Sequence, residues 1–138
     1  MTPCTDSVLL VDDSEIDLFI NKKILEFNHF SKNITSTTSP LKALEMLSQT
    51  DDALPEVVFL DLNMPIMDGF KFIQAFSTLP KFVQEHVSIV VLTSSENIND
   101  RRLAGKSEKV VHFVSKPLTD EKVIQLKSEF SLTKSLPN

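Results

Sequence analysis

The chain has 138 residues, which is the length of one domain with a single hydrophobic core. Its apolar and charged fractions are 41% and 24%, as in proteins that stay in water, and no stretch approaches the roughly 18 apolar residues that a membrane span needs. The net charge of −5 disfavours direct binding of nucleic acid, and the single cysteine, Cys4, rules out an internal disulfide.

The composition also limits the chemistry and the cellular location that we expect. Two glycines are too few for the glycine-rich loops that hold nucleotides, and the three histidines are too scattered for a zinc site. Residues 1–10 show neither the basic region nor the cleavage pattern of a secretory signal. Together with the lone cysteine, this predicts a cytoplasmic protein.

The first part of the chain predicts two strands and two helices in alternation. Residues 7–11 form a continuous apolar run, which is typical of a strand buried on both faces. Residues 12–14, DDS, offer helix caps before an apolar stripe at helical spacing over residues 15–28. Residues 33–37 are β-branched but polar, which predicts a strand at an exposed edge of the sheet. A serine and a proline then begin a second helix at residues 39–48.

The rest of the chain continues this alternation. The predicted strands are residues 56–61, 87–92 and 110–114. The predicted helices are residues 69–76, residues 96–104, whose helical pattern is weak, and a last helix with an apolar side formed by Val123, Leu126 and Phe130. Five strands alternating with five helices predict a parallel sheet covered on both faces, because parallel strands need crossover connections. We expect one domain at residues 7–132, with a lead at 1–6 and a tail at 133–138.

Polar side chains follow four of the predicted strands at their carboxyl ends. In an open α/β sheet this edge is where the functional crevice lies. The residues at these strand ends are Asp12 and Asp13, then Asp61, then Thr93 and Ser94, and finally Lys116 and Pro117. If the sheet is parallel, all of them converge on one rim.

The acidic residues of this rim predict a metal site. Asp12, Asp13 and Asp61 would repel one another unless a cation neutralised the group. Ligands that are all oxygen, without histidine or cysteine, indicate Mg²⁺, and the backbone carbonyl of Asn63 could supply one more oxygen.

A carboxylate beside Mg²⁺ can attack phosphorus, which makes Asp61 a candidate phosphoacceptor. The Thr93 hydroxyl and the Lys116 ammonium would then hold the phosphoryl oxygens that the metal does not. Each residue also has a structural alternative, as a helix cap, a turn former, a β-branched strand residue or a solvated charge. Their joint arrangement at four strand ends favours the functional interpretation.

The motifs of the chain resemble those of the receiver domain of two-component response regulators, of the chemotaxis type in particular. VDD at 11–13, D-x-N-M-P-x-M-D-G at 61–69, LTS at 92–94 and FVSKP at 113–117 occur in the order that this family shows. The resemblance implies an α/β fold of the flavodoxin-like, doubly wound kind, with five parallel strands in the order 2-1-3-4-5 and five helices.

The resemblance also implies a role for each residue of the site. Phosphorylation would involve Asp61 as phosphoacceptor, Thr93 and Lys116. The ligands of Mg²⁺ would be Asp12, Asp13, Asp61 and the backbone carbonyl of Asn63. Phe113 would be the aromatic residue of the conformational switch, and Asn63 and Ser95 would tune the lifetime of the phosphorylated state. The Lys116–Pro117 peptide bond would be cis.

With this resemblance, and because the sequence ends soon after the fifth predicted helix, we expect a stand-alone response regulator in a phosphorelay. Asp61 would receive a phosphoryl group from the phosphohistidine of a sensor histidine kinase or a histidine phosphotransfer protein. The domain would be a signalling module rather than an enzyme, although it would assist its own phosphorylation and dephosphorylation. Its downstream partner would be another protein, with no direct contact to nucleic acid or membrane, and it would be a monomer or a phosphorylation-dependent dimer.

Residues 95–110 depart from the family pattern, because they are polar and a few residues longer than usual. Their basic side chains indicate either a docking face for a partner or a solvated surface.

Three other interpretations are open to a chain of this kind. A haloacid-dehalogenase-like phosphatase needs a second aspartate two residues after the nucleophile, where this chain has Asn63. A flavodoxin-like flavin carrier needs a phosphate loop and aromatic side chains that stack on the flavin, and tryptophan and tyrosine are absent. A receiver-like scaffold that binds proteins without being phosphorylated is the remaining alternative, against which the intact acidic set argues.

Overall fold

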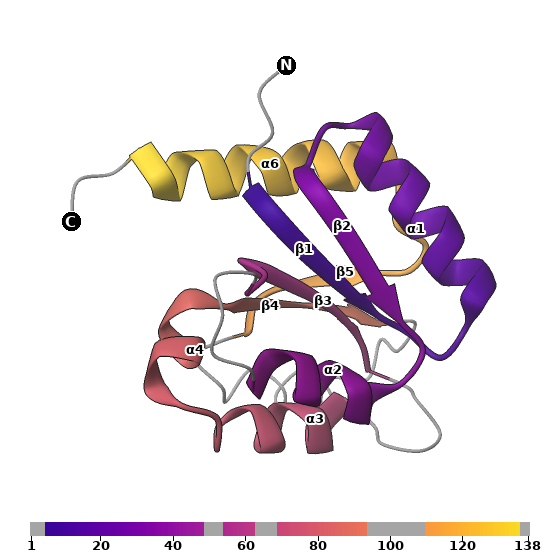
Figure 1. Ribbon diagram of the computed structural model, residues 1–138. Coiled ribbons are helices and arrows are strands. Elements are labelled where there is room, and N and C mark those ends of the chain that lie inside the picture. The colour runs from indigo at the N-terminus through magenta and orange to yellow at the C-terminus, as the bar shows by residue number, and fades with distance from the viewer. Residues whose placement is uncertain (1–4, 49–53, 63–68, 94–109, 136–138) are drawn as a thin grey trace.

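Five parallel strands form one sheet at the centre of the molecule, in the order β2-β1-β3-β4-β5 (Figure 1). The computed structural model describes residues 5–48, 54–62, 69–93 and 110–135. The strands are β1 Thr5–Val11, β2 Ser31–Thr37, β3 Val57–Asp61, β4 Ser88–Thr93 and β5 Val110–Ser115. The predicted strand order is confirmed, and the polar strand β2 lies at an edge of the sheet as its sequence indicated.

Five helices are present in the part of the chain that the structure describes. They are α1 Glu15–Phe27, α2 Pro40–Ser48, α3 Gly69–Phe76, α4 Lys81–His86 and α6 Asp120–Ser135. The short helix α4 was not predicted, and the helix predicted at 96–104 lies outside the described residues. None of the described helices combines the length and the apolar character that a membrane crossing would require.

The sheet separates two hydrophobic cores. One face packs against α2, α3 and α4, and the other packs against α1 and α6 (Figure 1). The largest fully buried side chains of the first core include Phe72 and Phe76, and those of the second include Phe30 and Phe59. Burial of each such side chain contributes about 1.5–3 kcal/mol to folding. The two cores thus hold the central strands, and the ends of these strands, in a fixed arrangement.

Serine side chains cap the starts of α1 and α2. The Ser14 hydroxyl accepts a hydrogen bond from the backbone N–H of Asp17 at the start of α1, and the Ser39 hydroxyl accepts one from Lys42 in α2. These bonds satisfy donors that the first turn of a helix leaves without partners. The predicted caps are therefore confirmed, and α1 and α2 each start at the edge of the sheet where the strand before them ends.

Gly69 allows α3 to begin against the end of β3. Its backbone N–H donates to the carbonyl oxygen of Leu62 at 2.9 Å. A Cβ atom at this position would lie 2.8 Å from the Cα of Leu62, closer than two such atoms can approach. The glycine of the D-x-N-M-P-x-M-D-G motif is thus required by the close approach of two backbone segments beside Asp61.

Candidate functional site

Three carboxylates lie together at the carboxyl edge of the sheet. Asp12 directly follows β1 and Asp61 ends β3, and these two strands are neighbours. One oxygen from each of Asp12, Asp13 and Asp61 lies within 4.8 Å of the others. Asp12 and Asp61 are only 2% and 3% exposed, whereas Asp13 is exposed. The structure therefore brings together the acidic residues that the sequence placed at two different strand ends.

Asp12 has both of the roles that its sequence position suggested, because it supports the start of a helix and belongs to the acidic cluster. Its Oδ1 accepts a hydrogen bond from the backbone N–H of Ser14, which orders the turn before α1. Its Oδ2 lies 3.3 Å from the ammonium of Lys116. The same side chain thus supports the start of the helix with one oxygen and presents the other to the site.

Lys116 reaches into the acidic cluster from the loop after β5. Its Nζ lies 3.2 Å from Asp61 Oδ1, 3.3 Å from Asp12 Oδ2 and 3.6 Å from Asp17 Oδ2. Its backbone N–H donates to the carbonyl oxygen of Thr93 at 2.9 Å, so the end of β4 supports this loop. Carboxylates from the end of β1, from α1 and from β3 therefore meet at one ammonium group.

The environment of Lys116 keeps its ammonium charged. Partial burial lowers the pKa of Lys116, but the nearby carboxylates of Asp61 and Asp12 outweigh this effect and raise the pKa above its ordinary value. At neutral pH the lysine is therefore a fixed positive charge within the acidic cluster.

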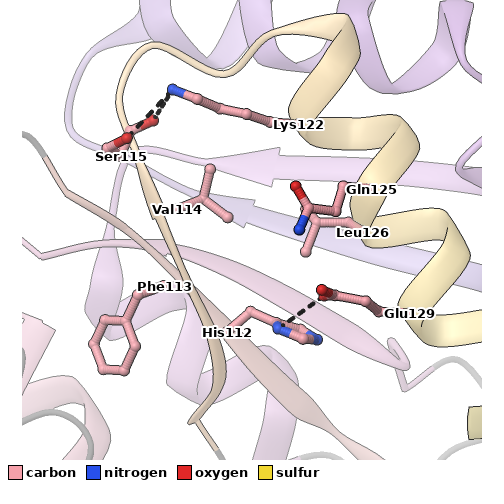
Figure 2. Close-up of a pocket in the computed structure, with 8 residues that line it drawn as sticks. All are labelled: His112, Phe113, Val114, Ser115, Lys122, Gln125, Leu126 and Glu129. Carbon is pink, nitrogen blue, oxygen red and sulfur yellow. Dashed lines mark hydrogen bonds and ion pairs between the residues drawn. The ribbon is translucent and has the colours of Figure 1, made fainter.

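Thr93 and Phe113 lie on the same face of the sheet, and Phe113 is two residues before the strand partner of Thr93. Thr93 pairs with Ser115, and Val91 pairs with Phe113. Phe113 is partly buried and packs against the core that α2 and α3 cover. Figure 2 shows that its ring points away from α6, whereas Val114 faces α6. The side chains of Thr93 and Phe113 therefore lie on the same face of the sheet, on adjacent strands.

The Lys116–Pro117 peptide bond is cis, as predicted. Asn63, Ser95 and residues 94–109 lie outside the described residues. The roles expected for the Asn63 carbonyl, for Ser95 and for the output region thus stay predictions.

A cavity of about 190 Å³ lies between β5 and α6 (Figure 2). Ser115 and Lys122 are among its lining residues, and none of the three clustered carboxylates is. His112 Nδ1 lies 3.1 Å from Glu129 Oε2 across this cavity. The cavity is therefore separate from the acidic cluster.

Two side chains beside the site were not identified from the sequence. Asp17 contacts Lys116 from the first turn of α1, and Lys122 contacts the loop that carries Lys116. The one available signal was position: Asp17 lies in the helical turn directly after the DDS segment, and Lys122 lies close after the KP pair.

Comparison with known proteins identifies the family. The family sequence model of the response regulator receiver domain matches residues 8–127, a range that includes every described residue of the site. The chain belongs to the response regulator receiver family. The predicted resemblance is thereby confirmed, and domains of this family act in two-component signalling.

Two curated relatives with a similar receiver domain are larger proteins. The chain is 29% identical over 120 residues to sensor histidine kinase CheAY of Helicobacter pylori, which covers 87% of this chain and 14% of that protein. It is 33% identical over 115 residues to protein-glutamate methylesterase/protein-glutamine glutaminase 1 of Pseudomonas savastanoi pv. phaseolicola, covering 82% of this chain and 30% of the relative. The receiver domain thus spans less than a third of the length of these curated relatives.

A solved structure matches nearly the whole receiver domain. The two component response regulator from Cytophaga hutchinsonii is 31% identical, with a TM-score of 0.82, and the match covers 91% of this chain and 96% of that one. The fold and the strand order described above are therefore those of a receiver domain.

Proposed function

We propose that this receiver domain accepts a phosphoryl group on Asp61 in a Mg²⁺-dependent reaction. The donor would be the phosphohistidine of a cytoplasmic sensor histidine kinase or histidine phosphotransfer protein. Phosphorylation would then change a surface that binds a downstream protein. The observation that carries this proposal is the gathering of Asp12, Asp13 and Asp61 around one rim, with the Lys116 ammonium between Asp12 and Asp61.

The donor set of this rim fits Mg²⁺. Three carboxylates and one ammonium leave a formal charge of −2, and the clustered ligand atoms are all oxygens. Asp12, Asp13 and Asp61 would hold the ion, together with the Asn63 carbonyl predicted from the motif. When bound, Mg²⁺ would neutralise charge on the phosphoryl oxygens during transfer.

The side chains of the chain itself supply the remaining chemistry. A carboxylate oxygen of Asp61 would form the new bond to phosphorus as the bond to the donor imidazole nitrogen breaks and the nitrogen keeps the electron pair. The Lys116 ammonium lies 3.2 Å from Asp61, so it would donate to a phosphoryl oxygen on that residue with little movement. Asp61 ends β3 at the rim, so a donor would approach it from this edge of the sheet.

The phosphoryl group would also select a second conformation. The Thr93 hydroxyl and the Lys116 ammonium would each gain a charge-assisted hydrogen bond that the unphosphorylated domain lacks. A change from mostly inactive to mostly active requires a differential of about 3–5 kcal/mol, and two such bonds with repacking of Phe113 can supply it. The strand register, which places Thr93 and Phe113 on one side of the sheet, supports this coupling.

The surface beside the rim supports a protein as phosphodonor. Helix α1 starts next to the carboxylates and exposes Ile16 (72%), Phe19 (64%), Ile20 (47%) and Phe27 (76%). Apolar side chains at these spacings lie on one side of a helix, and an exposed apolar stripe typically marks a protein contact. A donor that brings its histidine to Asp61 would bury this stripe.

A direct test is formation of the phosphoryl or beryllofluoride adduct. The wild-type chain and Asp61→Asn are incubated with Mg²⁺ and acetyl phosphate, or with Mg²⁺ and beryllofluoride, and examined by intact mass and by ¹⁹F NMR. We expect one adduct on the wild type, none on Asp61→Asn, and none without Mg²⁺. An adduct that persists on Asp61→Asn would overturn the phosphoacceptor assignment, and no adduct on the wild type would favour the scaffold alternative.

A further inference from the structure

Lys122 of α6 folds back onto the loop that carries Lys116. Its Nζ lies 2.6 Å from the carbonyl oxygen of Ser115, 2.9 Å from that of Pro117 and 3.3 Å from the Ser115 hydroxyl. Figure 2 shows the side chain reaching from the helix to Ser115. One ammonium thus binds the two carbonyl groups on either side of Lys116.

The position of Lys122 in α6 is electrostatically unfavourable for a cation. The helix begins at Asp120, and the Thr119 hydroxyl caps it by accepting from the backbone N–H of Lys122 at 3.3 Å. The amino end of a helix carries partial positive charge, so acidic residues are favoured there and lysine is not. The contacts with the two carbonyl oxygens offset this repulsion, because hydrogen bonds from a charged donor are strong.

These contacts fix the backbone from which the Lys116 side chain extends. Lys122 holds the residue before Lys116 and the residue after it, and the Lys116 N–H is held by Thr93. The side chain of Lys116 has four rotatable bonds, and its ammonium is aligned with Asp61 only if its Cα is fixed. A loss of the Lys122 contacts would therefore be felt at the acidic cluster.

We propose that Lys122 is a positioning residue for phosphoryl transfer, which acts by holding residues 115–117 so that the Lys116 ammonium stays beside Asp61. This inference rests on the proposed function, since it assigns Lys122 to the same reaction. Lys122 does not touch the reacting groups itself. Its contribution should therefore disappear when the Lys116 ammonium is absent.

The chain offers a matched control in the same helix. Lys127 also donates to a backbone carbonyl, that of Asn28 at the end of α1, at 2.7 Å. Lys127→Met removes a comparable bond without touching residues 115–117. Lys122→Met removes the ammonium and keeps the apolar stem, and Lys122→Arg keeps a charged donor.

The test measures the affinity of each full-length variant for beryllofluoride in the presence of Mg²⁺ by ¹⁹F NMR. We expect Lys122→Met to weaken binding about tenfold, as is typical when a partner that orients a ligand is removed. Lys122→Arg should retain most of the affinity, and Lys127→Met should leave it unchanged. In a Lys116→Met background, Lys122→Met should change the affinity by less than about twofold, because the two effects act through one group. Equal losses in both backgrounds, or a loss of thermal stability alone, would overturn the inference.

A second measurement separates this inference from the proposed function. Hydrogen exchange of the Lys116 amide reports directly on the loop and does not depend on any adduct. Lys122→Met should make this amide exchange about tenfold faster than in the wild type and in Lys127→Met, because exchange follows local opening. If the wild type binds no beryllofluoride, the proposed function fails and the exchange rate alone decides the positional claim. If Lys116→Met abolishes beryllofluoride binding, the double-variant comparison gives no result, and the exchange rate of the Lys116 amide again decides. An unchanged exchange rate in Lys122→Met refutes the proposal that Lys122 holds residues 115–117.

Discussion

Replacing Lys116 with methionine should lower the free energy of unfolding of the metal-free domain by about 3 kcal/mol. The ammonium lies 3.2 Å from Asp61 and 3.3 Å from Asp12, and both carboxylates are almost fully buried. At such a distance a pair of unit charges attracts by about 5 kcal/mol at an effective dielectric constant of 20, and desolvation of the three groups offsets part of this. Methionine removes the charge and leaves the two carboxylates to repel each other.

The Lys32–Asp6 ion pair provides a control with almost the same geometry. Its Nζ–Oδ1 distance is 3.3 Å, but the two side chains are 62% and 74% exposed. Exposed pairs contribute about 0–1 kcal/mol, so Lys32→Met should cost at most about 1 kcal/mol. The two substitutions therefore differ in the burial of the ion pair and in the number of carboxylates near the ammonium, which is three for Lys116 and one for Lys32.

The assay is urea unfolding of the wild type, Lys116→Met and Lys32→Met, in EDTA and again in excess Mg²⁺. A bound ion stabilises the folded state by about 2.7 kcal/mol at one hundred times its dissociation constant. Mg²⁺ should stabilise Lys116→Met more than the wild type, because no ammonium then competes for the carboxylates. Equal costs for the two lysine substitutions, or an equal Mg²⁺ effect on Lys116→Met and the wild type, would refute this account of the site.

Three further predictions concern other parts of the chain. Gly69→Ala should lower the free energy of unfolding, measured in urea, by about 1–3 kcal/mol, because the alanine Cβ would lie 2.8 Å from the Leu62 Cα. An unchanged free energy of unfolding would contradict this close approach. His29→Gly should raise stability by about 0.5 kcal/mol and His29→Ala should not, because His29 has a φ of 53° and only glycine adopts this conformation freely. Phe19→Ser should slow phosphotransfer from a histidine kinase more than from acetyl phosphate, because Phe19 is 64% exposed on α1; equal rate changes in a kinase-profiling assay would exclude this helix as the docking surface.

Much of the fold could be predicted because the strands repeat one pattern. The central strands are buried on both faces, so their sequences are continuous apolar runs that end where the polar rim begins. The amino ends of β1 and β2 were harder to predict. Each of these strands begins two residues before its predicted start, because Thr5 pairs with Ser31 although both are polar. Pairing between backbones extended these strands where hydrophobicity gave no signal.

The short helix α4 was missed for a related reason. Its six residues place one side chain, Val83, in the core, while its neighbour Phe82 is 46% exposed. A single buried residue cannot show the periodicity by which a helix is predicted. Packing against the sheet therefore determines this helix more than its own sequence does.

Part of the candidate site could likewise be predicted from the sequence, and part could not. Asp12, Asp13 and Asp61 could be placed together because strand ends converge whenever the sheet is parallel. The contacts of Asp17 and Lys122 could not, because they depend on how long side chains cross from one element to another. Sequence order determines which backbone ends meet, whereas side-chain direction emerges only from the packed structure.

The division of the interior by the sheet has a consequence for how a signal could pass through β5. Phe113 and Val114 are consecutive residues, yet they pack into different cores on opposite faces. If phosphorylation repacks the Phe113 ring as proposed, Val114 would keep its contacts in the core that α1 and α6 cover, so the two faces of β5 would respond separately. Since the chain contains no tryptophan, an indole introduced at position 113 would fluoresce without background and report on one compartment alone.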